Sequence, residues 1–102
     1  MSVDPDQCQS MAEVRDGVDS VDAEMVALLA RRFGYMRAAA RIKTDRATVR
    51  DEDRKAQVIR AVKDAARAGG VPEPLVAALW EMLIESSIAY EMALFDAGVG
   101  AS

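Results

Sequence analysis

Two cations stand where an apolar helix face should continue in the first half of the chain. Apolar residues recur in alternating steps of four and three at Val14, Val18, Val21, Met25 and Leu28. The next position in this rhythm is Arg32. Lys43 comes eleven residues later, and at about 100° per residue it points within roughly 20° of the same direction. Two fixed cations on one inward face indicate that an anion lies between them.

A second polar pair stands on an apolar face near the end of the chain. Ser87 and Glu91 are four residues apart, so they share one face of a helix. That face is flanked by Ile84, Ile88 and Phe95. A carboxylate among such neighbours is costly to bury unless it is paired or protonated. The residues alone leave two interpretations open: ordinary salt bridges from Glu91 to Arg32 or Lys43, or a site that acts on a bound anion.

Two further arginines could reach the same anion. Arg54 follows a charged loop, over which its side chain can reach back. Arg15 stands one step off the apolar stripe, about 42 Å along a helix from Lys43, so the two cannot share a small ligand within one chain. In an antiparallel pair of helices, however, Arg15 could enter the site of the partner.

The element that must position these cations is a helix predicted from about Met11 to Lys43. At roughly 1.5 Å per residue it would be close to 50 Å long. A compact domain of this size has a radius of gyration of only about 13 Å, so the apolar stripe would remain unburied in a monomer. Because a patterned helix of this length usually has a partner, we expect a homodimer in which the two long helices pair.

The rest of the chain predicts two shorter helices. Residues 1–10 form a loose N-terminal arm in which Cys8 is a packing residue. Residues 44–50 read as an exposed loop that could close over a ligand through Asp45, Arg46 and Arg50. Residues 11–96 then form one helical domain, and residues 97–102 a flexible tail.

Capping and turn residues set the ends of those two helices. Asp51 is a plausible N-cap for the second helix, and Gly69-Gly70 ends it. Its expected inward residues are Val58, Ile59, Val62, Ala65 and Ala66. Pro72 and Pro74 precede the third helix, which runs to about Asp96. Its expected inward residues are Val76, Trp80, Leu83, Ile84, Ile88 and Phe95.

Composition excludes several classes of function. The net charge of −4 argues against nucleic acid as a partner. No apolar run approaches the roughly 18 residues that span a membrane, and the polar N-terminus is no signal peptide. Cys8 is the single cysteine, which favours the cytoplasm. With no histidine in the chain, Ser–His and Cys–His nucleophile pairs are excluded, and the usual zinc site is too.

The ordered set of these residues resembles the all-helical chorismate mutase family over about residues 8–96. The motifs are R15-D-x-x-D-x-x-D, A-R-R32, A-A-R-I-K43, V-R-D-E-D-R54 and S87-x-x-x-E91. The resemblance implies an all-α, intertwined homodimer of the chorismate mutase type II kind, with one long and two shorter helices per chain. It also implies an enzyme that needs no metal or cofactor and rearranges the dianion chorismate to prephenate, in aromatic amino-acid biosynthesis.

The resemblance implies a role for each matching position. Arg32 would hold one substrate carboxylate, and Arg15 of the partner subunit would hold the other. Lys43 would donate to the ether oxygen, where negative charge grows as the C–O bond breaks. Glu91 stands where most bacterial members have a glutamine that also donates to this oxygen.

Three other positions match substrate-binding residues of the family. Arg54 corresponds to the arginine after the loop, Asp51 to the aspartate that precedes it, and Ser87 to a serine near the ring carboxylate. Lys55, by contrast, stands where the family usually has a glutamate near the substrate hydroxyl. An ionised Glu91 cannot donate a hydrogen bond, so its protonation matters to this role.

Two alternatives to a mutase remain open. The arm with Cys8, the stretch Y-M-R-A-A-A-R-I-K and the short loop resemble isochorismate pyruvate lyases, which make salicylate and pyruvate on the same fold. Ser87 and V-R-D-x-D-R favour a mutase. A 4-amino analogue of chorismate is a further possible substrate. The alternative from a different class is a non-catalytic helical dimer module.

Overall fold

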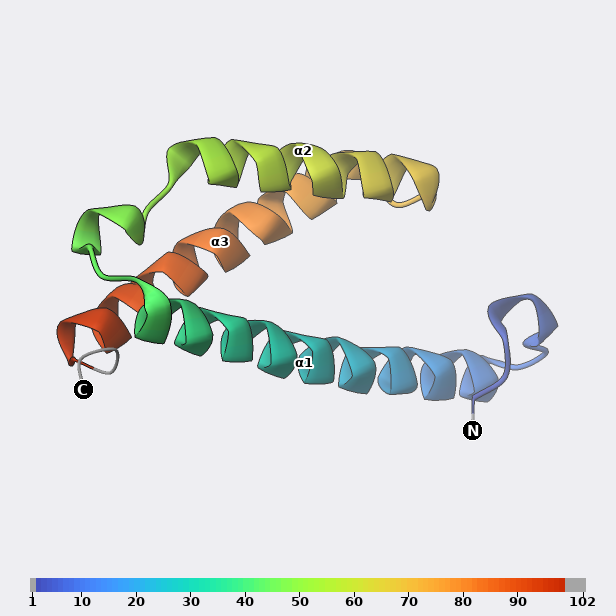
Figure 1. Cartoon of the computed structure of the whole chain (residues 1–102). Coiled ribbons are helices and arrows are strands. Elements are labelled where there is room, and N and C mark those ends of the chain that lie inside the picture. Colours follow the sequence, from blue (N-terminus) through green and yellow to red (C-terminus); the bar gives the residue numbers. More distant parts are fainter. Residues whose placement is uncertain (1, 99–102) are drawn as a thin grey trace. The chain divides into compact units, whose positions relative to one another are not determined.

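Three α-helices and two short 3-10 helices make up the computed structural model, which describes residues 2–98 (Figure 1). The α-helices are α1 (Met11–Ile42), α2 (Glu52–Ala68) and α3 (Glu73–Asp96), and the 3-10 helices are η1 (Pro5–Gln7) and η2 (Arg46–Thr48). No strand occurs among the described residues. The predicted all-α class is therefore confirmed, and each α-helix ends within a residue or two of its predicted boundary.

The chain divides into two compact units, one up to Tyr35 and one from Met36 onward, and α1 runs through both. In the first unit, side chains cap the start of α1. Ser10 Oγ accepts from the Glu13 N–H at 3.1 Å, and Glu13 Oε1 accepts from the Gln9 N–H at 3.0 Å. The first bond satisfies a backbone donor that the helix leaves unpaired, and the second ties the preceding residue to the same turn.

The N-terminal arm contains local structure that we did not predict. It contains η1, begun by Pro5, and Cys8 is half-buried with its Sγ 4.0 Å from the Val3 carbonyl oxygen. That same carbonyl oxygen would lie 4.0 Å from a Cβ placed on Gly17. The arm therefore lies against the first turns of α1, and Cys8 packs as expected.

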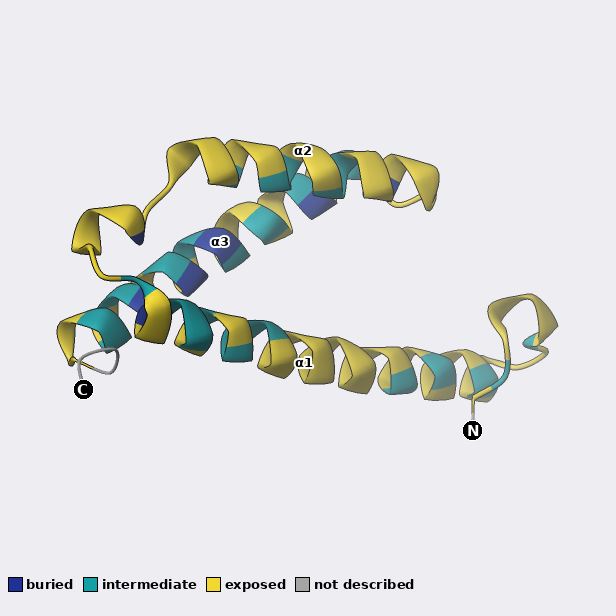
Figure 2. Ribbon diagram, viewed as in Figure 1, coloured by how far each residue is buried: buried dark blue, intermediate teal, exposed yellow. Residues whose placement is uncertain are grey.

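The apolar stripe of α1 is exposed, as its length predicted. Val18 and Val21 are both 52% exposed, Met25 is 51% exposed and Leu28 is 62% exposed. Figure 2 shows exposed residues along most of this helix. An apolar surface of this extent normally marks an interaction site.

In the second unit, α2 and α3 pack together and a tight turn joins them. Gly70 has φ +70°, the Val71 N–H donates to the Ala66 carbonyl at 2.8 Å, and the Gly70 N–H donates to that of Arg67 at 3.3 Å. This pattern is a Schellman motif, which needs a left-handed residue and so favours glycine. The predicted end of the second helix at Gly69-Gly70 is confirmed.

The buried apolar residues of this unit come from every part of it. They are Ala40, Val49, Ala66, Val76 and Ile84. The prediction that Ala65 is buried is wrong, because it lies about 100° around α2 from Ala66 and is exposed. The remaining apolar residues that we expected inward on α2 and α3 are half-buried.

The segment between α1 and α2 is exposed at residues 44–48 and 50, as predicted, but it contains a short helix and one buried residue that we did not predict. Asp45 accepts from the Ala47 N–H at 3.0 Å and so caps η2, and Val49 is only 4% exposed. Within residues 2–98, no helix is long and apolar enough to cross a membrane. Of the predicted tail, Ala97 and Gly98 close α3, and residues 99–102 lie outside the described residues.

Candidate functional site

Lys43 and Glu91 form the one ion pair of the described chain whose carboxylate is buried. Lys43 Nζ lies 2.8 Å from Glu91 Oε2, and the side chains are 29% and 6% exposed. Such a carboxylate would be costly to bury without this cation. The pairing of these two residues, one of the alternatives left open by the sequence, is therefore present.

Contacts between the end of α1 and α3 hold Lys43 in this place. Lys43 follows the last residue of α1, and its N–H still donates to the Ala39 carbonyl at 2.9 Å. Ala40 is fully buried, and Arg37 Nη1 donates to the Tyr90 hydroxyl at 3.1 Å. The lysine thus extends from the end of a helix whose last turns are partly buried and contact α3.

Ser87 lies one turn before Glu91 on the same face of α3. The two residues are 3% and 4% exposed, and they are the buried polar residues of the described chain. Ser87 Oγ donates to the Leu83 carbonyl at 2.7 Å, so the hydroxyl oxygen presents its lone pairs away from the helix backbone. The predicted shared face is confirmed, and it is buried.

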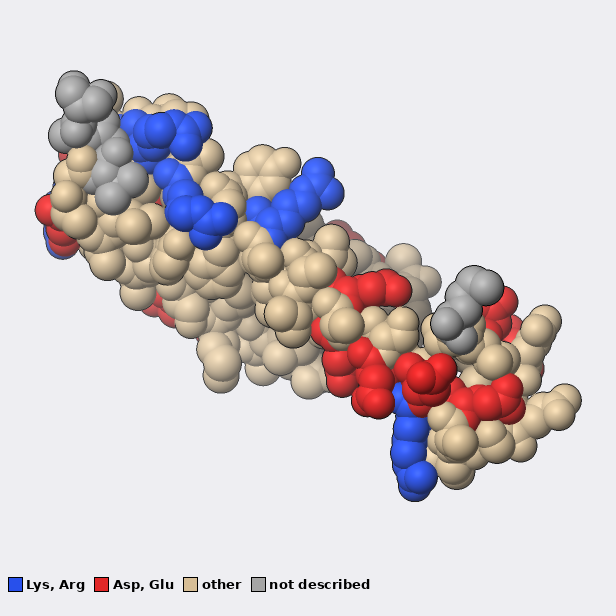
Figure 3. Space-filling view, turned by 90° about the horizontal axis from the view of Figure 1, so that it is seen from below, with Lys and Arg blue, Asp and Glu red and all other residues tan. Residues whose placement is uncertain are grey.

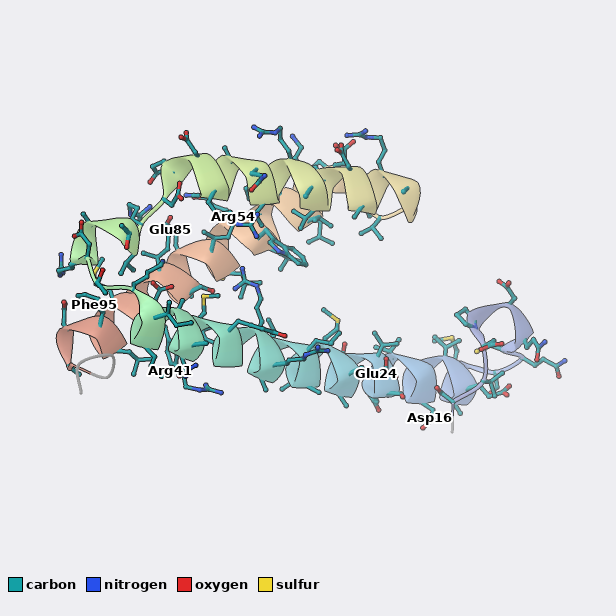
Figure 4. All side chains as sticks on the ribbon, viewed as in Figure 1. Asp16, Glu24, Arg41, Arg54, Glu85 and Phe95 are labelled. Carbon is teal, nitrogen blue, oxygen red and sulfur yellow. The ribbon has the colours of Figure 1, made fainter. Side chains whose placement is uncertain are left out.

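Asp51 and Arg54 lie in the first turn of α2. Asp51 Oδ1 accepts from the Arg54 N–H at 2.9 Å, which confirms the predicted N-cap. The Arg54 side chain, labelled in Figure 4, is exposed. Its Nη1 donates to Gln57 Oε1 at 2.6 Å. The substrate-binding roles of both residues stay predictions.

Arg15 and Arg32 lie on the part of α1 that belongs to the first unit. Arg15 is exposed and Arg32 is half-buried. Lys43 and Glu91 belong to the second unit, so the joining of these arginines with them in one site stays a prediction. Acidic side chains gather on the same part of α1 (Figure 3), contributed by Glu13, Asp16, Asp19, Asp22 and Glu24.

The sequence did not predict a set of ion pairs that join residues 46–55 to α3. Arg46 and Arg50, which the sequence predicted could close over a ligand, bind carboxylates of α3. Arg46 Nε lies 2.8 Å from Asp96 Oδ1, and Arg50 Nη2 lies 2.6 Å from Glu85 Oε1. Lys55 Nζ lies 2.8 Å from Glu85 Oε2. Charge alone could not reveal these partners, because they lie 30 or more residues away in the sequence.

These contacts change the titration of Glu85. Hydrogen bonds from Arg50 first and Lys55 second lower the pKa of Glu85 from the usual 4.5 to about 2. A carboxylate with a lowered pKa in the folded state contributes stability above its unfolded-state pKa and loses it as the pH falls toward the folded-state pKa.

We therefore expect Glu85→Gln to lower the free energy of unfolding at pH 7, with a difference from wild type that closes between about pH 4.5 and about pH 2. Urea titrations at one fixed protein concentration across this range would measure it. A difference that stays constant down to pH 2 would contradict the assignment of these ion pairs.

Comparison with known proteins identifies a matching protein family and a similar enzyme. The family model described as chorismate mutase type II matches residues 14–92. The isochorismate pyruvate lyase of Pseudomonas aeruginosa is similar to this chain, with 30% identity over 88 residues that cover 86% of this chain and 87% of the relative. All the candidate site residues, from Arg15 to Glu91, fall within the matched range.

Proposed function

The chain belongs to the chorismate mutase type II family, and on that premise we propose that it is a chorismate mutase that rearranges chorismate to prephenate. The observation that supports the proposal most is the placement of the Lys43 ammonium, 2.8 Å from the buried Glu91 carboxylate. In this proposal the ether oxygen of the substrate takes a position beside Lys43.

The reaction suits a site of this composition. A Claisen rearrangement breaks one C–O bond and forms one C–C bond within a single molecule, so it needs no nucleophile, metal or net proton transfer. The protein must hold a flexible dianion in its reactive conformer and stabilise the charge that grows on one oxygen. Lys43 supplies a positive charge that stabilises this negative one, while Arg15, Arg32 and Arg54 are the proposed partners of the substrate's polar groups.

A second candidate function is that of an isochorismate pyruvate lyase. It is favoured by the Pseudomonas aeruginosa relative, which carries that name. The mutase is favoured by Ser87, which is buried one turn from Glu91, and by Asp51 at the start of α2. The lyase reaction also breaks the ether C–O bond, so Lys43 would act at the same oxygen in either case.

Separate incubations with chorismate, its 4-amino analogue and isochorismate test these functions. We expect prephenate from chorismate with a higher kcat/KM than that for salicylate and pyruvate from isochorismate. The reverse order would assign the lyase, and faster turnover of the amino analogue would assign that substrate. Failure of all three substrates would favour the non-catalytic helical dimer module.

We further propose an intertwined homodimer, which the exposed stripe on α1 supports. The side chains of this stripe are exposed to solvent within residues 2–98, at Val18, Val21, Met25 and Leu28. A second copy running antiparallel would cover them, and would bring acidic side chains of one α1 near Arg31 and Arg32 of the other. We keep the cytoplasm as the proposed location, since the single cysteine fits a reducing compartment.

Mixing two inactive variants tests the shared site. Arg15→Ala and Lys43→Ala should each abolish most activity as homodimers. A heterodimer of the two variants should be active in one of its two sites, because that site combines an intact Lys43 with the partner's intact Arg15. Random exchange should restore about a quarter of the wild-type sites. A lack of recovery despite subunit exchange, or a folded monomer at micromolar concentration by light scattering, would overturn the proposal.

A further inference from the structure

Glu85 on α3 binds two side chains that come from opposite ends of one short segment. Arg50 reaches it with both terminal nitrogens, at 2.6 Å to Oε1 and 3.1 Å to Oε2. Lys55 Nζ reaches Oε2 at 2.8 Å and also contacts Glu81 Oε1 at 2.7 Å. A two-point arginine–carboxylate contact fixes orientation as well as distance. Glu85 thus ties the start of α2 to the middle of α3.

The segment between these two anchors carries candidate site residues. Arg50 and Lys55 flank Asp51 and Arg54 in the sequence, and the Asp51 cap joins those two within the first turn of α2. Glu85 itself lies two residues before Ser87 on α3. Figure 4 labels Glu85 on α3 and Arg54 on α2. One carboxylate therefore connects the turn that carries Arg54 with the helix that carries Ser87 and Glu91.

The stability that Glu85 contributes at neutral pH is only part of the reason for this arrangement. Arg50 and Glu85 are 43% and 40% exposed, and ion pairs of this kind contribute little to the free energy of folding. Lys55 is only 18% exposed, and it lies between two carboxylates that would otherwise repel each other one turn apart on α3. These ion pairs also have a geometric effect, because they limit how the first turn of α2 can move relative to α3.

We propose that Glu85 is a positioning residue, which acts through Arg50 and Lys55 to hold Arg54 in the place where it meets the substrate. This inference rests on the proposed function and names a residue that the sequence motifs did not include. It also assigns a role to Lys55, whose ammonium binds the two glutamates of α3.

Glu85→Gln and Lys55→Gln test the proposal, with Glu73→Gln as the matched control. Glu73 makes a similar two-point contact with Arg67, at 3.2 Å for each of its oxygens, and joins the other ends of α2 and α3. We expect kcat/KM to fall between about 5-fold and 100-fold for Glu85→Gln, since small misplacements of a binding group have effects up to this size. Lys55→Gln should act in the same direction, and the control should stay within about twofold of wild type.

A double-mutant cycle separates positioning from general weakening. In an Arg54→Ala background, Glu85→Gln should have no further effect on kcat/KM, because the residue through which it acts is absent. Losses that multiply in the double variant would overturn the inference. Equal activities of Glu85→Gln, Lys55→Gln and the Glu73→Gln control would also overturn it.

Amide hydrogen exchange provides a test that needs no activity. Exchange at residues 51–55 should be faster in Glu85→Gln than in wild type, and unchanged there in the Glu73→Gln control. Unchanged exchange in Glu85→Gln would overturn the positioning role. Should wild type act on none of the three substrates, the proposed function fails by itself, and the exchange result still decides whether Glu85 holds this turn.

Discussion

Replacing Lys43 by alanine should lower kcat about 100- to 1000-fold, as the loss of one oxyanion donor does in other enzymes. The hydrogen bond from Lys43 strengthens as the ether oxygen gains charge, so it stabilises the transition state more than the bound substrate. We therefore expect KM to change less than kcat. Steady-state kinetics with chorismate would measure both values.

Three controls for this experiment follow from the structure. Lys43→Ala leaves Glu91 buried without its cation, which weakens the fold, so circular dichroism must show that the variant is folded. Lys43→Gln keeps a neutral donor and should retain more activity than alanine. Arg41→Ala removes an exposed cation two residues away and should leave the rate nearly unchanged. Near-wild-type activity of a folded Lys43→Ala would remove the mechanism.

The second large effect concerns Glu91 and pH. As a donor to the ether oxygen, Glu91 must carry a proton when the substrate is bound. If Glu91 is such a donor, the rate should fall as the pH rises, by up to about tenfold for each pH unit once the proton is lost.

Glu91→Gln supplies an amide donor of nearly the same shape at every pH. This variant should therefore keep its rate at pH 8 and show a flatter profile than wild type. The contrary outcome is equally informative: a wild-type rate that is level from about pH 5 to 8, with an inactive Glu91→Gln, would mean that Glu91 acts as an anion. It would then hold Lys43 in place through the 2.8 Å contact of this structure.

Features with local physical causes could be predicted from the sequence. The step of three and four residues between apolar positions predicted α1, and Asp51 predicted the start of α2. Gly70 predicted the turn after α2, because that turn needs a positive φ. The shared face of Ser87 and Glu91 followed from helix periodicity in the same way. Each of these signals acts within about one helical turn.

Features that join distant parts of the chain were decided only by the tertiary structure. Lys43 and Glu91 are 48 residues apart, and the sequence left the partner of Glu91 open between two cations. The carboxylates of α3 that Arg46 and Arg50 bind could not be identified from the sequence, and Val49 is buried in a segment that we predicted to be exposed. Long charged side chains can reach many partners, so helix packing selects which carboxylate lies within reach.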